Sequence, residues 1–101
     1  MSDLRLIGFE DLDASELEAV KKIIAKRVEK INIKYQLLSI ELKQHKHEYK
    51  HLTRIIHELR ADLFFSTGKA ISAKAEDANL YKALDKLIDK LLVEVKRKFK
   101  K

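Results

Sequence analysis

Apolar residues recur every three or four positions between residues 17 and 31, which is the spacing of one face of an α-helix. Two capping boxes compete for the start of that helix, because Ser15 and Glu18, like Asp13 and Glu16, lie three positions apart. The two boxes place the start of the helix two residues apart, and both starts are left as alternatives. The helix is predicted to end near residue 31 or 32.

A second, longer amphipathic stretch lies near the carboxyl end of the chain. It predicts a helix from about Asn79 to Lys98, with Asp77 or Ala78 near its cap. We expect Tyr81 among the core residues of this helix. The apolar positions return on one helix face and are Leu80, Tyr81, Leu84, Leu87, Ile88, Leu91, Leu92, Val95 and Phe99.

Alternation of apolar and polar residues predicts strands in the rest of the chain. The stretches 35–44, 59–65 and 71–76 alternate in this way, and the short apolar segment 4–9 is a candidate first strand. Turn-forming residues at 66–69 join two of these strands into a hairpin. In the stretch 35–44, the side chains expected on one face are Leu38, Ile40 and Leu42.

The segment between residues 48 and 59 is ambiguous. Its apolar residues have helical spacing, yet a helix continuing to Leu63 would consume the strand that the hairpin needs. We therefore predict a turn or a short helical turn at 47–54 and a strand that begins near Ile55 or Ile56.

These elements follow one another in the order β-α-β-β-β-α, which is an α+β fold. A small sheet of three or four strands, with both helices packed on one face, would bury the alternating strand residues. This layout is like that of double-stranded-RNA-binding domains. At 101 residues, the chain is expected to form a single domain over residues 1–101.

Composition excludes several classes of function. The absence of cysteine rules out disulfides and cysteine-ligated metal sites, and two glycines are too few for nucleotide-binding loops. No apolar run approaches the roughly 20 residues that cross a bilayer, and the amino-terminal residues do not resemble a signal peptide. We therefore expect a cytoplasmic protein without membrane contact.

Basic residues outnumber acidic ones by 22 to 16, which gives a net charge of +6. By helical geometry, a row of cations lies opposite the apolar face of each helix. Side by side, the two rows would form one broad positive surface suited to RNA, although ordinary solvated helix faces are the alternative. The expected RNA-binding residues are Lys22, Lys26, Lys30, Lys82, Lys86, Lys90, Lys96, Arg97 and Lys100.

No group of residues predicts catalysis. Asp85 and Asp89 lie four positions apart among lysines, so we interpret them as forming ion pairs on the surface of one helix. The four histidines match no zinc spacing and are assigned to a polar turn. We therefore expect no metal, no cofactor, no small-molecule substrate and no enzymatic activity. These histidines are His45, His47, His51 and His57.

The run Asn79-Leu80-Tyr81-Lys82-Ala83-Leu84-Asp85 is the most specific feature of the chain. It follows an Ala-x-Ala strand end and precedes Asp89-Lys90-Leu91 at an unbroken spacing. It resembles the hallmark Asp-Met-Tyr-x-Ala-Ile-Asp of the ribosome hibernation promoting factors, also called ribosome-associated inhibitors or sigma-54 modulation proteins. The specific part of this resemblance covers residues 71–98, whereas residues 43–57 carry no signature of the family.

The resemblance implies a short-type factor, with one ribosome-binding domain and no C-terminal dimerisation domain. It implies binding in the mRNA and tRNA channel of the small ribosomal subunit, against 16S rRNA, and promotion of hibernation in idle ribosomes. We expect a monomer off the ribosome. The match to the last helix gives an RNA-facing role to Lys82, Lys86, Lys90 and Arg97, and position on the fold gives it to Lys22, Lys26 and Lys30.

Two other functions stay open. One is a general double-stranded RNA-binding module, although such modules carry their basic cluster at the start of the last helix, which here reads Asn79-Leu80-Tyr81. The other is a protein-interaction domain that binds no nucleic acid and whose lysines are merely solvated.

Overall fold

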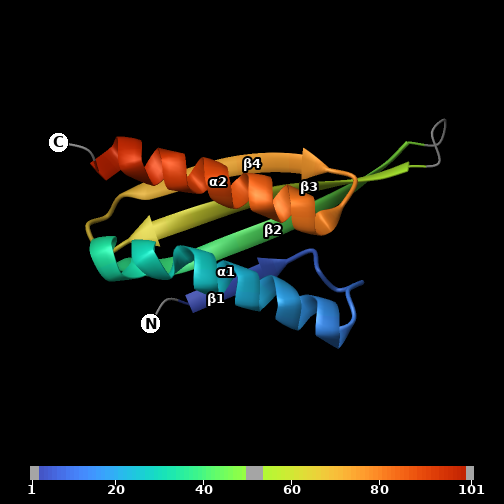
Figure 1. Ribbon diagram of the computed structural model, residues 1–101, viewed down its shortest axis with the longest axis horizontal. Helices are drawn as coiled ribbons and strands as arrows, with labels where there is room; N and C mark the ends of the chain where they lie inside the picture. Colours follow the sequence, from blue (N-terminus) through green and yellow to red (C-terminus); the bar gives the residue numbers. More distant parts are fainter. Residues whose placement is uncertain (1–2, 50–53, 100–101) are drawn as a thin grey trace.

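The chain folds into one sheet of four strands with two helices on one of its faces (Figure 1). The computed structural model describes residues 3–49 and 54–99, without the side chains of residues 30, 32, 33, 49 and 54. The predicted α+β class and the order β-α-β-β-β-α are confirmed. The elements are β1 (Asp3–Ile7), α1 (Ala14–Tyr35), β2 (Leu37–Tyr49), β3 (Arg54–Phe65), β4 (Ala70–Asp77) and α2 (Leu80–Phe99).

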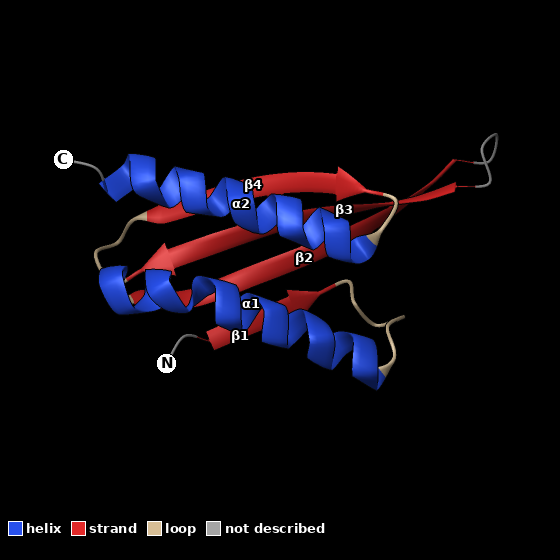
Figure 2. Ribbon diagram, in the orientation of Figure 1, coloured by secondary structure: helices blue, strands red, loops and turns tan. Residues whose placement is uncertain are grey.

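The strands lie in the sheet in chain order, β1-β2-β3-β4. β1 runs parallel to β2, so the chain needs a crossover between them, which α1 provides. β2, β3 and β4 are antiparallel neighbours. β2 and β3 continue past both helices as an arm, formed by residues 45–49 and 54–58 (Figure 2). The arm is two-stranded beyond His57, which forms the last pair with β4.

The core lies between the helices and one face of the sheet. Along β3 the buried positions alternate as predicted, and Leu59, Ala61, Leu63 and Phe65 are at most 2% exposed. They pack with the apolar faces of both helices in one cluster. The helix residues buried in this cluster include Val20, Ile24, Val28 and Ile31 from α1, and Leu84, Leu87, Ile88, Leu91 and Val95 from α2.

The first helix is longer than predicted. It begins after Asp13, whose carboxylate accepts a hydrogen bond from the backbone amide of Glu16 at 2.8 Å, so the earlier of the two capping boxes is the one used. It ends at Tyr35 instead of residue 31 or 32, because Gln36 adopts a left-handed conformation with a φ of 56°. The following strand therefore starts at Leu37, two residues later than predicted.

The prediction for Leu38 is wrong. A bulge between Leu37 and Ser39 shifts the register of β2 against β3. The extra residue turns Leu37 inward, at 4% exposure, and leaves Leu38 56% exposed. Beyond the bulge, Ile40 and Leu42 are buried as expected.

The predicted turn at 47–54 is also wrong where the structure describes it. His47 and Glu48 continue β2 and stand opposite Ile56 and Ile55 of β3. This cross-strand pairing overrides the helical spacing of the local apolar residues. The rest of that prediction, residues 50–53, lies outside the described residues.

A glycine ends the first strand earlier than predicted. Gly8 has a φ of 84°, and a β-carbon there would come within 2.3 Å of the backbone oxygen of Gln44. Only a residue without a side chain fits this close approach. β1 consequently stops at Ile7, and Phe9 turns into the core at 5% exposure.

The burial pattern of β2 and β3 gives a matched pair of stability variants. Leu63→Ala removes a side chain that is 0% exposed and should lower the free energy of unfolding by about 2–5 kcal/mol. Leu38→Ala, at a position 56% exposed, should cost at most about 0.5 kcal/mol. Urea unfolding measures both, and equal losses would contradict the facing of these two residues.

Candidate nucleic-acid interface

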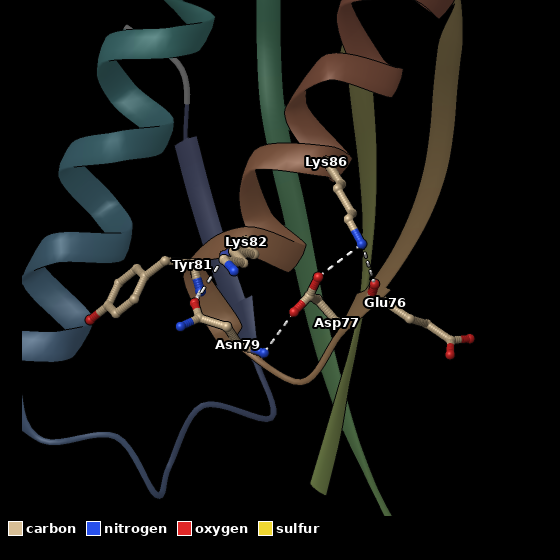
Figure 3. Close-up of polar contacts among 6 residues, drawn as sticks. All are labelled: Glu76, Asp77, Asn79, Tyr81, Lys82 and Lys86. Atoms are coloured by element: carbon tan, nitrogen blue, oxygen red, sulfur yellow. Dashed lines mark hydrogen bonds and ion pairs between the residues drawn. The ribbon is translucent and has the colours of Figure 1, made fainter.

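The start of α2 is fixed by two side chains in the β4–α2 turn (Figure 3). The carboxamide oxygen of Asn79 accepts hydrogen bonds from the backbone amides of Tyr81 and Lys82, at 2.9 and 3.1 Å. Asp77 accepts one from the amide of Asn79 at 2.9 Å. Asn79 is therefore the cap, instead of Asp77 or Ala78, and the helix begins at Leu80.

Two of the predicted RNA-binding lysines on α2 contact β4. The ammonium group of Lys86 lies 2.8 Å from a carboxylate oxygen of Asp77 and 3.4 Å from the backbone oxygen of Glu76 (Figure 3). The ammonium group of Lys90 donates to the backbone oxygen of Lys74 at 2.7 Å. β4 is an edge strand, so these lysines cover carbonyl groups that no neighbouring strand pairs.

The two helices are joined by a fork of ion pairs. The guanidinium group of Arg27, on α1, lies 2.7 Å from Asp85 and 2.9 Å from Asp89, both on α2. The hydrogen bond to Asp85 raises the pKa of Arg27 above its ordinary value. The prediction that these aspartates pair within their own helix is therefore wrong, because the sequence does not show which partner the neighbouring helix supplies.

The fork also separates the two predicted rows of cations. Asp85 and Asp89 lie on the side of α2 that contacts α1, whereas Lys86 and Lys90 reach the opposite side, toward β4. The outer surface therefore has a basic row on each helix with an acidic seam between them. This differs from the single continuous positive surface expected from the sequence.

Of the other predicted RNA-binding residues, those whose side chains the structure describes are solvent-exposed. Arg97 lies 3.4 Å from Glu94 and keeps 76% of its side chain exposed. The side chain of Lys30, and Lys100 as a whole, lie outside the described residues. Four of the predicted lysines are exposed and form no ion pair within the described ranges: Lys22, Lys26, Lys82 and Lys96.

Tyr81 does not belong to the core, contrary to expectation. It is 39% exposed, and its ring points from α2 toward α1 in Figure 3. The nearby Ala83 is 0% exposed and belongs to the core cluster. The apolar face of α2 is therefore narrower at its first turn than the sequence pattern indicates.

The histidines lie on strands instead of in a polar turn. His45 and His47 are on β2 and His57 is on β3, whereas His51 lies outside the described residues. His47 is 3.2 Å from the carboxylate of Glu58, and this hydrogen bond lowers the pKa of Glu58. Within residues 3–49 and 54–99, no three histidine or acidic side chains are grouped closely enough to hold a metal ion.

A polar chain joins the arm to the segment after β1. Gln44, 5% exposed, donates to the backbone oxygen of Gly8 at 2.9 Å, so its own oxygen accepts the Nδ1 hydrogen of His57 at 2.8 Å. Burial, and then the charge of Lys46, lowers the pKa of His57. Lys46 also forms an ion pair with Asp11. These contacts connect β2 and β3 to the segment that follows β1.

The open face of the sheet carries charge in rows. Register places Lys43, Arg60 and Lys74 beside one another across β2, β3 and β4. Like charges on facing positions repel, but Glu41 and Asp62 lie within 3.2 and 3.5 Å of Lys43 and Arg60. This face is thus balanced in charge, and it offers matched controls for the helix lysines.

The ion pair of Asp77 makes the free energy of unfolding depend on pH in a way that can be tested. The hydrogen bond from Lys86, followed by that from the amide of Asn79, lowers the pKa of Asp77 below its ordinary value of 3.8. Its stabilising contribution is therefore complete above that value and is lost as the pH falls through the lowered pKa. Asp77→Asn should be less stable than the unmodified protein at about pH 6, with a difference that shrinks below about pH 4.

Urea unfolding over this pH range measures that difference. Lys86→Met keeps the apolar part of the side chain but removes the ammonium group, and it should reduce the same pH dependence. A difference between Asp77→Asn and the unmodified protein that stays constant down to about pH 2 would contradict the role of this ion pair.

Comparisons with known proteins place this geometry in a family. Residues 9–101 match the family described as sigma 54 modulation protein / S30EA ribosomal protein. No curated protein matches the sequence closely enough to count as a relative. Neither described helix carries an apolar stretch long enough to cross a membrane.

Two solved structures share the fold. A ribosomal subunit interface protein from Coxiella burnetii superposes with a TM-score of 0.71 at 18% identity, over 98% of this chain and 99% of that one. The N-terminal domain of Protein Y from Thermus thermophilus gives 0.57 at 20% identity, over 96% and 98%. With the family match over nearly the whole length, the chain belongs to the sigma 54 modulation protein / S30EA ribosomal protein family.

Proposed function

We propose that this protein binds the small ribosomal subunit, occupies its mRNA and tRNA channel against 16S rRNA, and so promotes hibernation of idle ribosomes. The observation that carries the proposal is the family match over residues 9–101. Membership in this family makes the chain a ribosome-associated factor. In this function the protein acts by occupancy, as a single domain and a monomer off the ribosome, and performs no chemical step.

The exposed cations on the helices supply the physical basis. Lys22, Lys26 and Lys82 present ammonium groups that form no ion pair with the described residues. Contacts with phosphate groups release counterions, so affinity falls steeply as salt rises. Lysines act as point charges and read the RNA backbone without reading base sequence. Such a surface fits folded ribosomal RNA better than a specific single-stranded sequence.

Direct contact of Lys86 or Lys90 with RNA requires that existing contacts of their ammonium groups be broken. Their ammonium groups are held by β4 and must leave Asp77 and the Lys74 carbonyl before they bind a phosphate directly. In their observed positions, the two ammonium groups add positive electrostatic potential near the surface without contacting RNA directly. We therefore assign direct contact first to the exposed lysines on both helices and to Arg97.

Sedimentation with purified small ribosomal subunits tests the proposal. The protein should pellet with them at about 50 mM salt and largely dissociate by about 200 mM or above. A tenfold excess of a plain RNA duplex should leave most of the protein on the subunits. Equal competition by the duplex would favour a general double-stranded RNA-binding module, and absence from the pellet at low salt would refute the proposal.

A triple variant on the helices locates the interface. Lys22→Gln, Lys26→Gln and Lys82→Gln together should weaken binding about tenfold and reduce the slope of log affinity against log salt by about 2–3. The matched control carries Lys43→Gln, Arg60→Gln and Lys74→Gln on the open sheet face. It removes the same charge and should change the affinity less than about threefold, because distant exposed charges are screened. Equal effects of the two triples would contradict the helix interface.

A further inference from the structure

One end of the molecule carries positive charge from three elements, and only two of its cations, Lys96 and Arg97, are among the predicted RNA-binding residues. α1 and α2 both end there, beside the turn between β3 and β4 (Figure 1). All five of its cations are exposed. We call this group the basic end; its members are Lys34 from α1, Lys69 from the turn, and Lys96, Arg97 and Lys98 from α2.

The segments that form the basic end contain no acidic residue. Residues 31–40, 63–71 and 95–99 include neither aspartate nor glutamate. On the neighbouring strand β1, Asp3 stands opposite Ser39 of β2. Among the described residues, only Arg97 of this group forms an ion pair, with Glu94 at 3.4 Å. The positive charge of the basic end is therefore far less compensated than that of Lys86, which is paired with Asp77.

Aromatic rings hold two of these lysines in place. The rings of Tyr35 and Phe99 stack with centroids 4.5 Å apart, and Phe65 meets Phe99 edge-on at 4.9 Å. The ammonium group of Lys34 lies 5.4 Å from the Tyr35 centroid, and that of Lys69 lies 4.7 Å from the Phe99 centroid. Cation–π contacts of this kind reduce the freedom of the side chains and leave the positive charge in place.

The turn that carries Lys69 is itself tied to the end of α1. The backbone amide and the hydroxyl of Ser66 donate to the backbone and side-chain oxygens of Gln36, at 3.1 and 2.9 Å. The amide of Phe65 donates to the backbone oxygen of Lys69 at 3.0 Å. Lys34 and Lys69 are therefore positioned relative to one another by these hydrogen bonds as well as by the rings of Tyr35 and Phe99.

Helix ends explain only part of this charge. The carboxyl end of each helix carries roughly half a unit of negative charge, which favours basic residues in the last turn. Two such ends together offset about one of the five cations, and Lys69 does not lie on a helix at all. A surplus of positive charge remains at this end.

The opposite end of the molecule has the reverse sign. Glu10, Asp11, Asp13 and Glu16 lie around the start of α1, and residues 1–14 carry a net charge of −3. The molecule measures 47 Å along its longest axis, which runs from one end to the other in Figure 1. A polyanion therefore attracts one end and repels the other, which orients the protein as it approaches.

We infer that the basic end is a binding site for RNA phosphate groups and that it enters the RNA first, with the acidic end facing outward. This inference rests on the proposed function and extends it, because the helix rows alone do not fix an orientation. The rings of Tyr35 and Phe99 contact one another and the two lysines, so they order the cations and do not stack on bases. Binding at this end is therefore insensitive to RNA sequence.

The test compares two triple variants with equal loss of charge. Lys34→Gln, Lys69→Gln and Lys98→Gln should weaken binding to small ribosomal subunits about tenfold or more and reduce the salt slope by about 2–3. The open-face control, Lys43→Gln with Arg60→Gln and Lys74→Gln, should change the affinity less than about threefold. Urea unfolding verifies that both variants are folded.

A conservative variant separates charge from packing. Lys34→Arg, Lys69→Arg and Lys98→Arg keep the positive charge and the ability to lie over aromatic rings, so this triple should bind as the unmodified protein does. If the glutamine triple matches the open-face control, or if the arginine triple loses as much affinity as the glutamine triple, the inference is overturned.

A short RNA hairpin as a second ligand distinguishes failure of the inference from failure of the proposed function. If the unmodified protein binds the hairpin through the basic end but does not pellet with small subunits, the proposed function fails and the phosphate site stands. If it pellets with subunits and the basic-end triple does too, only the inference fails. Binding to neither ligand overturns both.

Discussion

The rest of the structure depends on the two-residue alternation of β3. This strand pairs with β2 on one side and β4 on the other, and its inward residues lie beneath both helices. A slip of one residue would exchange Leu63 with Phe64 and place Arg60 or Asp62 in the core. Because buried charges without partners are strongly unfavourable, the register is fixed, and with it the positions of the two edges and of each helix.

The parts of the fold that the sequence predicts are those set by local periodicity. The alternation from Leu59 to Phe65 and the apolar face of α2 both repeat over many residues, so small errors at the ends did not affect the architecture. The bulge at Leu38 has no such signal in the sequence. One inserted residue reverses which side chains of β2 face the core, and its place is defined only by the pairing with β3. The extension of β2 to Tyr49 likewise depends on pairing with a distant strand.

The candidate site was less predictable than the fold. Helical geometry identifies which lysines face away from the core, but it does not identify their partners on other elements. Asp85 and Asp89 find Arg27 on the other helix, and Lys86 finds Asp77 at the end of a strand. Lys34 and Lys69 could not be predicted as neighbours because they are far apart in sequence and are brought together by the stacked rings of Tyr35 and Phe99 and by the contacts of the β3–β4 turn with Gln36.

Charge in this molecule serves structure as well as recognition, and the two uses are distributed over different residues. Arg27 joins the helices, Lys46 holds the arm through Asp11, and exposed lysines remain for solvent or a polyanion. A count of basic residues therefore overstates the surface available to RNA. The net charge of +6 counts all of these residues alike, whereas the contacts of individual lysines show which of them remain exposed.

The position of Lys90 has a consequence for the protein's behaviour at high concentration. Its ammonium group covers the carbonyl of Lys74 on an edge strand, where another copy could otherwise add a strand and begin a growing assembly. The ammonium group of Lys90 therefore covers one backbone position at which a further strand could pair with the edge of the sheet.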